Sequence, residues 1–173
     1  ALVRATLYDG LSQLRRARLH SRVGEAIASL RSADLDPHLP QLAHHFAQAA
    51  PVEQPERAID FALAAARRAD RLLAWEEAAQ HYRAALRSRE LAGAPDDRIR
   101  AELLLALGAS EDRAGMEEEA RATFSAAAVT ARRLADMPLL GRAALGFAGQ
   151  WSILGRVDDN RLVLLEEALE GLG

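Results

Sequence analysis

The chain has 173 residues, a formal net charge of −3 and no cysteine, and half of its residues are hydrophobic. This length is enough for one domain with its own core, while the lack of cysteine excludes a disulfide framework and a thiolate metal site. The mildly acidic, evenly mixed charge gives little support to nucleic-acid binding, and no apolar stretch approaches the roughly 18 residues of a membrane span. We therefore expect a cytoplasmic protein that contacts neither nucleic acid nor membrane directly.

The composition favours helix along almost the whole chain, because it is rich in Ala, Leu, Arg and Glu. No segment alternates apolar and polar residues in the manner of a half-buried strand, so we predict an all-α fold. Prolines, glycines and capping residues separate nine predicted helices, at about 2–9, 12–30, 38–49, 55–72, 75–91, 97–113, 117–134, 138–151 and 159–172.

Local signals mark most of these boundaries. Ser12 is the predicted N-cap of the second helix, and Asp96 is that of the sixth. The turn between the fourth and fifth helices contains neither Gly nor Pro, so this helix boundary has the weakest sequence signal of all. The second helix carries apolar residues spaced three and four apart, as an amphipathic helix requires, at Leu19, Val23, Ile27 and Leu30.

One pattern of side chains occurs twice, and it predicts a helix-hairpin repeat. It consists of a small, an aromatic and a small residue at i, i+4 and i+7, behind a run of Glu. The two copies are Ala78, Tyr82 and Ala85, and Ala120, Phe124 and Ala127. Leu107-Gly108 lies upstream of the second copy. Small residues allow helices to cross closely, and we expect Tyr82 and Phe124 to fill the space between successive hairpins.

These positions match the tetratricopeptide (TPR) pattern. The match is good around residues 101–128, partial around 59–86 and weak around 139–172. The expected fold is a TPR-like α-α superhelix of about nine helices in stacked antiparallel hairpins. The alternative is a generic helical bundle with an Ala-rich core.

The N-terminal part adds a resemblance to a family. The segments that carry it are Leu2-Val3-Arg4, Leu7-Tyr8, Leu11, Arg15-Arg16, Leu19-His20 and Val23, then LAHHF at 42–46 and ERAIDFALAAARRADRLLAWEEAAQHYRAAL at 56–86. Over about residues 1–130 the chain resembles LuxR-type bacterial transcriptional regulators with an AAA/STAND-type ATPase, and relatives that carry an adenylate cyclase domain.

The resemblance implies an ATPase core upstream and an output domain downstream. It implies that residues 1–30 are the helical tail of a winged-helix segment linked to the ATPase, and that 31–173 form a TPR-like repeat domain. The chain has no G-x-x-x-x-G-K-[ST] loop for phosphates. We therefore expect a non-catalytic sensor and protein-interaction arm without a cofactor, whose partners are the regulator's other domains and an inducer or partner protein.

Other functions fit the same helices. The chain would also suit a stand-alone peptide-docking TPR scaffold or the regulatory region of an adenylate cyclase-type signalling protein. A further alternative, from a different class, is a fragment of an α-helical enzyme.

The histidines do not indicate a metal site. His44 and His45 are adjacent, so on a helix they point about 100° apart. His38 and His81 offer no partner four residues away, and His20, in the motif RLH, is expected to have a structural role.

Catalysis is not expected from the acidic residues either. The runs Glu76-Glu77 and Glu117-Glu118-Glu119 fall in the first turns of predicted helices, where acidic residues interact favourably with the helix dipole.

A ligand groove is the sharper hypothesis. In TPR repeats the first helix of each pair lines the concave face, and the register places seven candidates there: Arg67, Arg71, Asp112, Arg113, Phe147, Gln150 and Trp151. Arginines beside aromatic rings suit an anionic or sugar-like ligand or a peptide carboxylate. The alternative is a solvated helix face, with Trp151 buried against the ninth helix.

Overall fold

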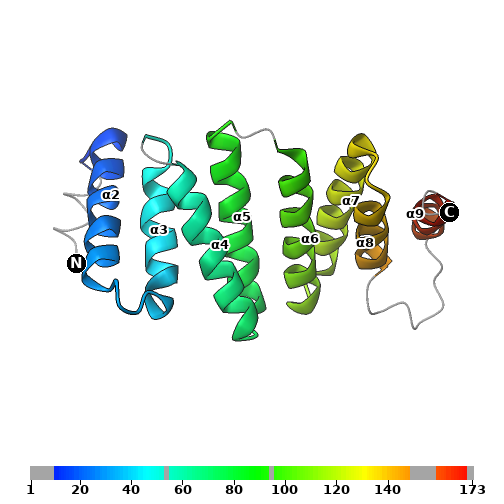
Figure 1. The fold of residues 1–173 in the computed structure, drawn as a ribbon, viewed down its shortest axis with the longest axis horizontal. Helices are drawn as coiled ribbons and strands as arrows, with labels where there is room; N and C mark the ends of the chain where they lie inside the picture. Colours follow the sequence, from blue (N-terminus) through cyan, green and yellow to red (C-terminus); the bar gives the residue numbers. More distant parts are fainter. Residues whose placement is uncertain (1–9, 53–54, 94–95, 149–158, 171–173) are drawn as a thin grey trace. The chain divides into compact units, whose positions relative to one another are not determined.

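The computed structural model describes residues 10–52, 55–93, 96–148 and 159–170. Within these ranges the chain is all-helical and has no strand, which confirms the predicted all-α class. In the described part of the chain, eight α-helices follow one another and pack in adjacent pairs (Figure 1). They are α2 (Gln13–Leu30), α3 (Leu39–Ala49), α4 (Pro55–Arg71), α5 (Trp75–Leu91), α6 (Asp97–Arg113), α7 (Glu117–Leu134), α8 (Met137–Ala148) and α9 (Asp159–Glu170), with a 3-10 helix, η1 (Asp36–His38), before α3.

Both predicted N-caps are confirmed. The Ser12 hydroxyl accepts a hydrogen bond from the Arg15 backbone N–H at 3.4 Å, and Asp96 accepts one from the Ile99 N–H at 3.1 Å. Each cap satisfies a backbone donor that the first turn of a helix leaves unpaired. The predicted helix at 2–9 and the predicted extension of the eighth helix to 151 lie outside the described residues.

The turn between α4 and α5 is made without glycine. Leu73 adopts a positive φ of 59°, and Ala135, at the end of α7, adopts 51°. Glycine usually occupies such left-handed positions after a helix, as Gly93 and Gly115 do here with φ of 61° and 74°. After α4 this left-handed position is occupied by Leu73 and not by glycine. The sequence therefore shows no glycine or proline that would mark the end of this helix.

The helices form two compact units. Unit 1 consists of Ala1–Leu73 and Arg83–Ala94, and unit 2 consists of Ala74–Tyr82 and Pro95–Gly173. Helix α5 therefore contributes its first half to unit 2 and its second half to unit 1. The assignment of residues 1–30 to a winged-helix-linked segment stays a prediction, but α2 itself packs against α3 within unit 1.

The core of unit 1 is centred on Phe46 of α3, which is 1% exposed. Its ring stacks on Phe61 of α4 with the ring centroids 4.9 Å apart, and the Arg57 guanidinium lies 4.2 Å above it. At the tip of the ring, a Cβ added to Gly24 of α2 would lie only 2.9 Å from Cζ of Phe46. Helix α2 can therefore approach α3 this closely because residue 24 has no side chain.

The expected apolar stripe of α2 does not form its buried face. Leu19, Val23 and Leu30 are 43%, 42% and 82% exposed, and only Ile27 packs against the unit 1 core. The buried residues of α2 are instead small: Ala17, Ser21 and Gly24. The prediction was wrong because the large Phe46 side chain on α3 occupies the contact, which leaves room only for small residues on α2.

Unit 2 is organised around Phe124 of α7. Its side chain is 5% exposed, and Ala120 and Ala127 are buried on the same helix face. A Cβ on Gly108 of α6 would lie 2.9 Å from the ring, and one on Gly146 of α8 would overlap it. Phe124 thus fills the space between α6 and α8, as the small-aromatic-small pattern predicts for this residue.

The earlier copy of the pattern is also buried. Ala78 and Ala85 are 0% exposed, and Tyr82 is 6% exposed. Both copies of the pattern therefore place their members in the protein interior, as helices that pack through small side chains require.

Candidate functional site

The candidate groove residues of unit 1 lie on α4. Arg71 is paired with Asp36 of η1, with a nitrogen-to-oxygen distance of 2.8 Å, and Arg68 pairs with the same carboxylate at 3.1 Å. Arg67 is exposed. The double pair joins η1 to α4, so the carboxylate of Asp36 competes with any external anion for Arg71.

The candidates of unit 2 have other partners. The Arg113 guanidinium lies 5.0 Å from the ring centroid of Trp75, and that of Arg121 lies 5.0 Å from the ring centroid of Phe147. These are cation-π distances. Asp112 is half-buried. Gln150 and Trp151 lie outside the described residues. Because the candidates divide between the two units, a common groove stays a prediction.

A cluster that the sequence did not predict lies on the hairpin of α2 and α3. The ring centroid of His20 is 5.6 Å from that of His44 and 5.1 Å from that of His45, and the latter two are 5.3 Å apart. The Nδ1 atoms of His20 and His45 are 2.9 Å apart, which is a hydrogen-bond distance. We call these three residues the histidine cluster.

The His20–His45 hydrogen bond depends on protonation. Nδ1 of one ring must donate and Nδ1 of the other must accept, so at least one of the two rings is neutral. Burial lowers the pKa of both rings from the ordinary value of 6.5, and the charge of neighbouring histidines lowers it further. His44 lowers the pKa of His20 in this way, and both His20 and His44 lower that of His45.

These shifts predict that acid weakens the hairpin. Since the folded pKa values lie below 6.5, the unfolded chain binds more protons, and the stability contributed by the neutral rings is complete above pH 6.5 and is lost as the pH falls below it. We expect the melting temperature to fall between about pH 7.5 and about pH 5.5, and to fall less in His20→Gln. Comparing the two proteins removes the contribution of His81, whose pKa is also lowered by burial. Equal slopes in both proteins would contradict this prediction.

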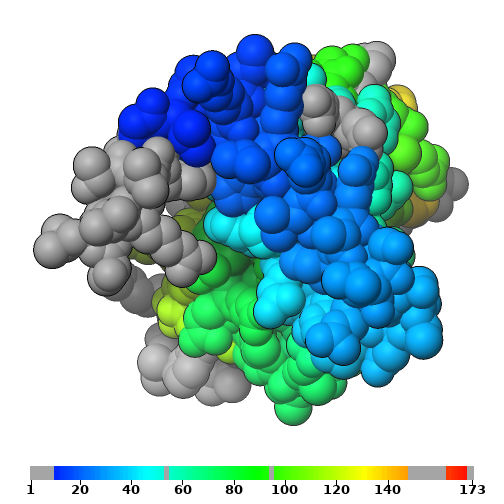
Figure 2. Space-filling view, turned by 90° about the vertical axis from the view of Figure 1, so that its left-hand side faces the viewer, coloured from blue at the N-terminus to red at the C-terminus, as the bar shows by residue number. Residues whose placement is uncertain are grey.

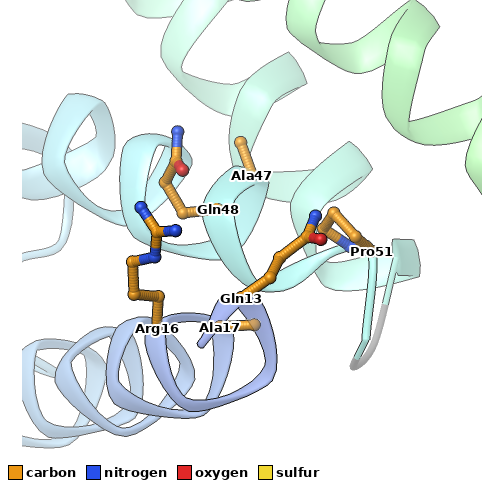
Figure 3. A pocket seen from close by; sticks show the side chains of 6 residues that line it. All are labelled: Gln13, Arg16, Ala17, Ala47, Gln48 and Pro51. Atoms are coloured by element: carbon orange, nitrogen blue, oxygen red, sulfur yellow. The ribbon is translucent and has the colours of Figure 1, made fainter. Parts of the chain in front are cut away.

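A pocket of about 270 Å³ lies between the same two helices (Figure 3). Its lining residues are Gln13, Arg16 and Ala17 of α2, Ala47 and Gln48 of α3, and Pro51. The side chains of Arg16 and Gln48 extend on the same side, while Gln13 lies towards Pro51. Two carboxamides and a guanidinium are thus among the groups that line the pocket, together with two alanines.

The pocket and the histidine cluster are neighbours along one flank of the hairpin. On α2, Arg16 precedes His20 by four residues, and on α3, Gln48 follows His44 by four. Residues four apart lie one above the other on a helix face. Figure 2 shows the surface of α2 in blue, with α3 in cyan beside it.

The sequence did not predict the cluster, because spacing along the chain relates histidines of one helix and not those of two different helices. His20 meets the other two across the hairpin, and their meeting depends on the register of α2 against α3. The close contact of Gly24 with Phe46 restricts that register. The presence of histidines on two helices expected to be neighbours is the feature of the sequence that could have indicated this cluster.

The two remaining histidines have polar neighbours. Nε2 of His81 lies 3.6 Å from Glu77, four residues earlier, so the expectation that His81 has no such partner is wrong. His38 Nδ1 lies 3.5 Å from the Gln41 side-chain oxygen. In the part of the chain that the structure describes, no group of three or more His, Cys, Asp or Glu residues is arranged to hold a metal ion.

The acidic runs lie where the sequence places them. Glu76 and Glu77 are in the first turn of α5, and Glu117, Glu118 and Glu119 are in the first turn of α7. There they interact favourably with the helix dipole.

No protein-family model matches the chain, and no curated protein is significantly similar to it. Within the described ranges, none of the helices has the length and apolar character needed to cross a membrane.

Proposed function

We propose that this chain is a non-catalytic binding arm with a TPR-like superhelix, belonging to a LuxR-type transcriptional regulator with an AAA/STAND-type ATPase. The packing of Phe124 against Gly108 and Gly146 carries the proposal. An aromatic ring set between two glycine-bearing helices allows hairpins to stack side by side, and stacks of this kind bind partners along extended surfaces.

The resemblance of the N-terminal part supports the assignment to this family. The motifs from Leu2 to Phe46 and the segment at 56–86 occur in the order found in those regulators. In such a protein the arm senses an inducer or partner in the cytoplasm and restrains or releases the ATPase. Nucleic-acid contact would belong to the output domain.

The gene that encodes this chain provides the first test. We expect a G-x-x-x-x-G-K-[ST] motif upstream and a helix-turn-helix output domain downstream. Flanking sequences without an ATPase motif would contradict the regulator assignment and favour the stand-alone scaffold.

ATP hydrolysis provides the second test. Deleting residues 96–173 from the full-length protein should change its basal hydrolysis rate by about fivefold or more, because the arm is coupled to the ATPase. An unchanged rate would contradict the role as a sensor. The isolated 173-residue chain should not hydrolyse ATP, and hydrolysis by it would favour the enzyme alternative.

A further inference from the structure

We propose that the outer face of α2 is a docking surface for a helix of a partner protein, and that this helix carries glutamate beside its apolar residues. The inference rests on the proposed function, since it names the kind of partner that one surface of the binding arm accepts.

The docking surface consists of four residues of α2 that we call the apolar seam: Leu19, Val23, Ala26 and Leu30. All four are exposed, and the exposed fractions of Leu19, Val23 and Leu30 are 43%, 42% and 82%. Ala26 follows the buried Ala17 by nine residues, which places it about 180° away around the helix. The seam therefore faces away from α3, the helix against which α2 packs. Figure 2 shows α2, in blue, at the surface of unit 1.

The spacing of the seam specifies the shape of its occupant. The four residues follow one another at intervals of four, three and four. This is the alternation of a and d positions in a heptad, with Leu19 and Ala26 at d and with Val23 and Leu30 at a. A partner helix can lie along such a row and insert its own apolar side chains between those of the seam.

The charges beside the seam specify the sign of the partner's charge. Arg15 and Arg22 both occupy g positions in this heptad register, and both are exposed. Neither forms an ion pair with a residue that the structure describes. The only acidic residue of α2, Glu25, does not border the seam and is paired with Arg57 of α4 at 3.4 Å. Because charges at e and g positions select the partner of a coiled-coil helix, the two arginines favour a helix with glutamate at the facing positions.

Two other occupants fit this surface less well. A second copy of α2 would bring Arg15 and Arg22 of both chains to one interface, where like charges repel. An anionic membrane attracts arginine, but helices that lie in a membrane surface present a broad apolar face rich in Trp, Phe and Leu. The seam is only two positions wide and contains no aromatic residue. A single acidic helix matches both its width and its charge.

A synthetic peptide of about three heptads is a suitable probe, with leucine at a and d and glutamate at e and g. Its glutamates repel one another, so they oppose pairing of the peptide with itself. We expect saturable binding to the 173-residue chain by fluorescence anisotropy, weakened by added salt. A matched peptide with lysine in place of glutamate should bind at least about tenfold more weakly. The absence of saturable binding by the glutamate peptide would overturn the proposal.

Charge reversal tests the role of the two arginines. Arg15→Glu/Arg22→Glu should bind the glutamate peptide about tenfold or more weakly than the wild type does, and should bind the lysine peptide more tightly. Both residues are exposed, so circular dichroism should show an unchanged helix content. A loss for the glutamate peptide without a gain for the lysine peptide would overturn the charge assignment.

The seam itself is tested with a matched pair of variants. Val23→Gln should weaken peptide binding by about tenfold or more, because it removes an apolar contact from the centre of the seam. Leu14→Gln is the control, since Leu14 is 43% exposed on the same helix but lies nine residues before Val23, on the opposite side. This variant should bind as the wild type does. Wild-type affinity in Val23→Gln, or equal losses in both variants, would overturn the docking surface.

The alternative occupants have outcomes of their own. The chain alone should sediment as a monomer, and its binding to vesicles of phosphatidylcholine and phosphatidylserine should not depend on Val23. A dimer that Val23→Gln dissociates, or vesicle binding that Val23→Gln abolishes, would overturn the proposal in favour of a second copy or a membrane. These experiments need no ATPase, so a failed docking surface leaves the regulator proposal standing. Likewise, an unaltered ATP hydrolysis rate leaves the docking surface standing.

Discussion

Phe124→Ala is expected to destabilise unit 2 by about 3–5 kcal/mol, the largest effect of any single change considered for this protein. The side chain is 5% exposed, and its ring contacts the positions of Gly108 and Gly146 on two different helices. Removing the ring leaves a cavity between α6, α7 and α8, which rigid helices cannot readily collapse to fill. Urea denaturation followed by far-ultraviolet circular dichroism measures the loss.

Val129→Ala is the matched control for this prediction. Val129 lies on the same helix, α7, but is 61% exposed, so its truncation removes little buried surface and should change the stability by less than about 0.5 kcal/mol. Similar losses in the two variants would show that Phe124 does not fill the space between the helices.

Two glycines of α8 should respond to alanine in opposite directions. Gly146→Ala is expected to destabilise the protein by about 1–3 kcal/mol, because the new methyl group would overlap the Phe124 ring. Gly141→Ala is expected to stabilise it by about 0.5–1 kcal/mol, because the nearest atom, the Cβ of Ala168, is 4.0 Å away and alanine favours helix over glycine.

The double variant Gly146→Ala/Phe124→Ala completes this experiment. If the methyl group clashes with the ring, its cost should disappear once the ring is removed, so the two effects should not add. Additive losses, or stabilisation by Gly146→Ala alone, would contradict the close packing of α8 on Phe124. Chemical denaturation of the four proteins under one set of conditions decides between these outcomes.

Much of the local structure follows from short-range chemistry. The caps at Ser12 and Asp96 are confirmed, and so is the burial of the small-aromatic-small positions around Phe124. These features depend on residues within about two turns of one another. The boundary after α4 was the least marked, because Leu73 adopts a conformation for which glycine would have been the usual signal.

The candidate sites were harder to predict, because they depend on which helix faces meet. The hairpin pocket and the histidine cluster combine Arg16 and His20 of α2 with Gln48 and His45 of α3. A hydrophobicity pattern identifies the apolar side of a helix, but it does not say which side a neighbour's largest residue will contact. Here Phe46 of α3 packs against the face of α2 that contains Gly24.

The sequence by itself determined that the chain is helical, where most of its helices begin and end, and that small residues around Phe124 would be buried. Each of these properties is set by interactions within one helix or by the size of a side chain. Only the tertiary structure decided the register of α2 against α3, and with it the exposure of Leu19 and the meeting of His20 with His45. That register depends on the fit of Phe46 against Gly24, a contact between residues on separate helices.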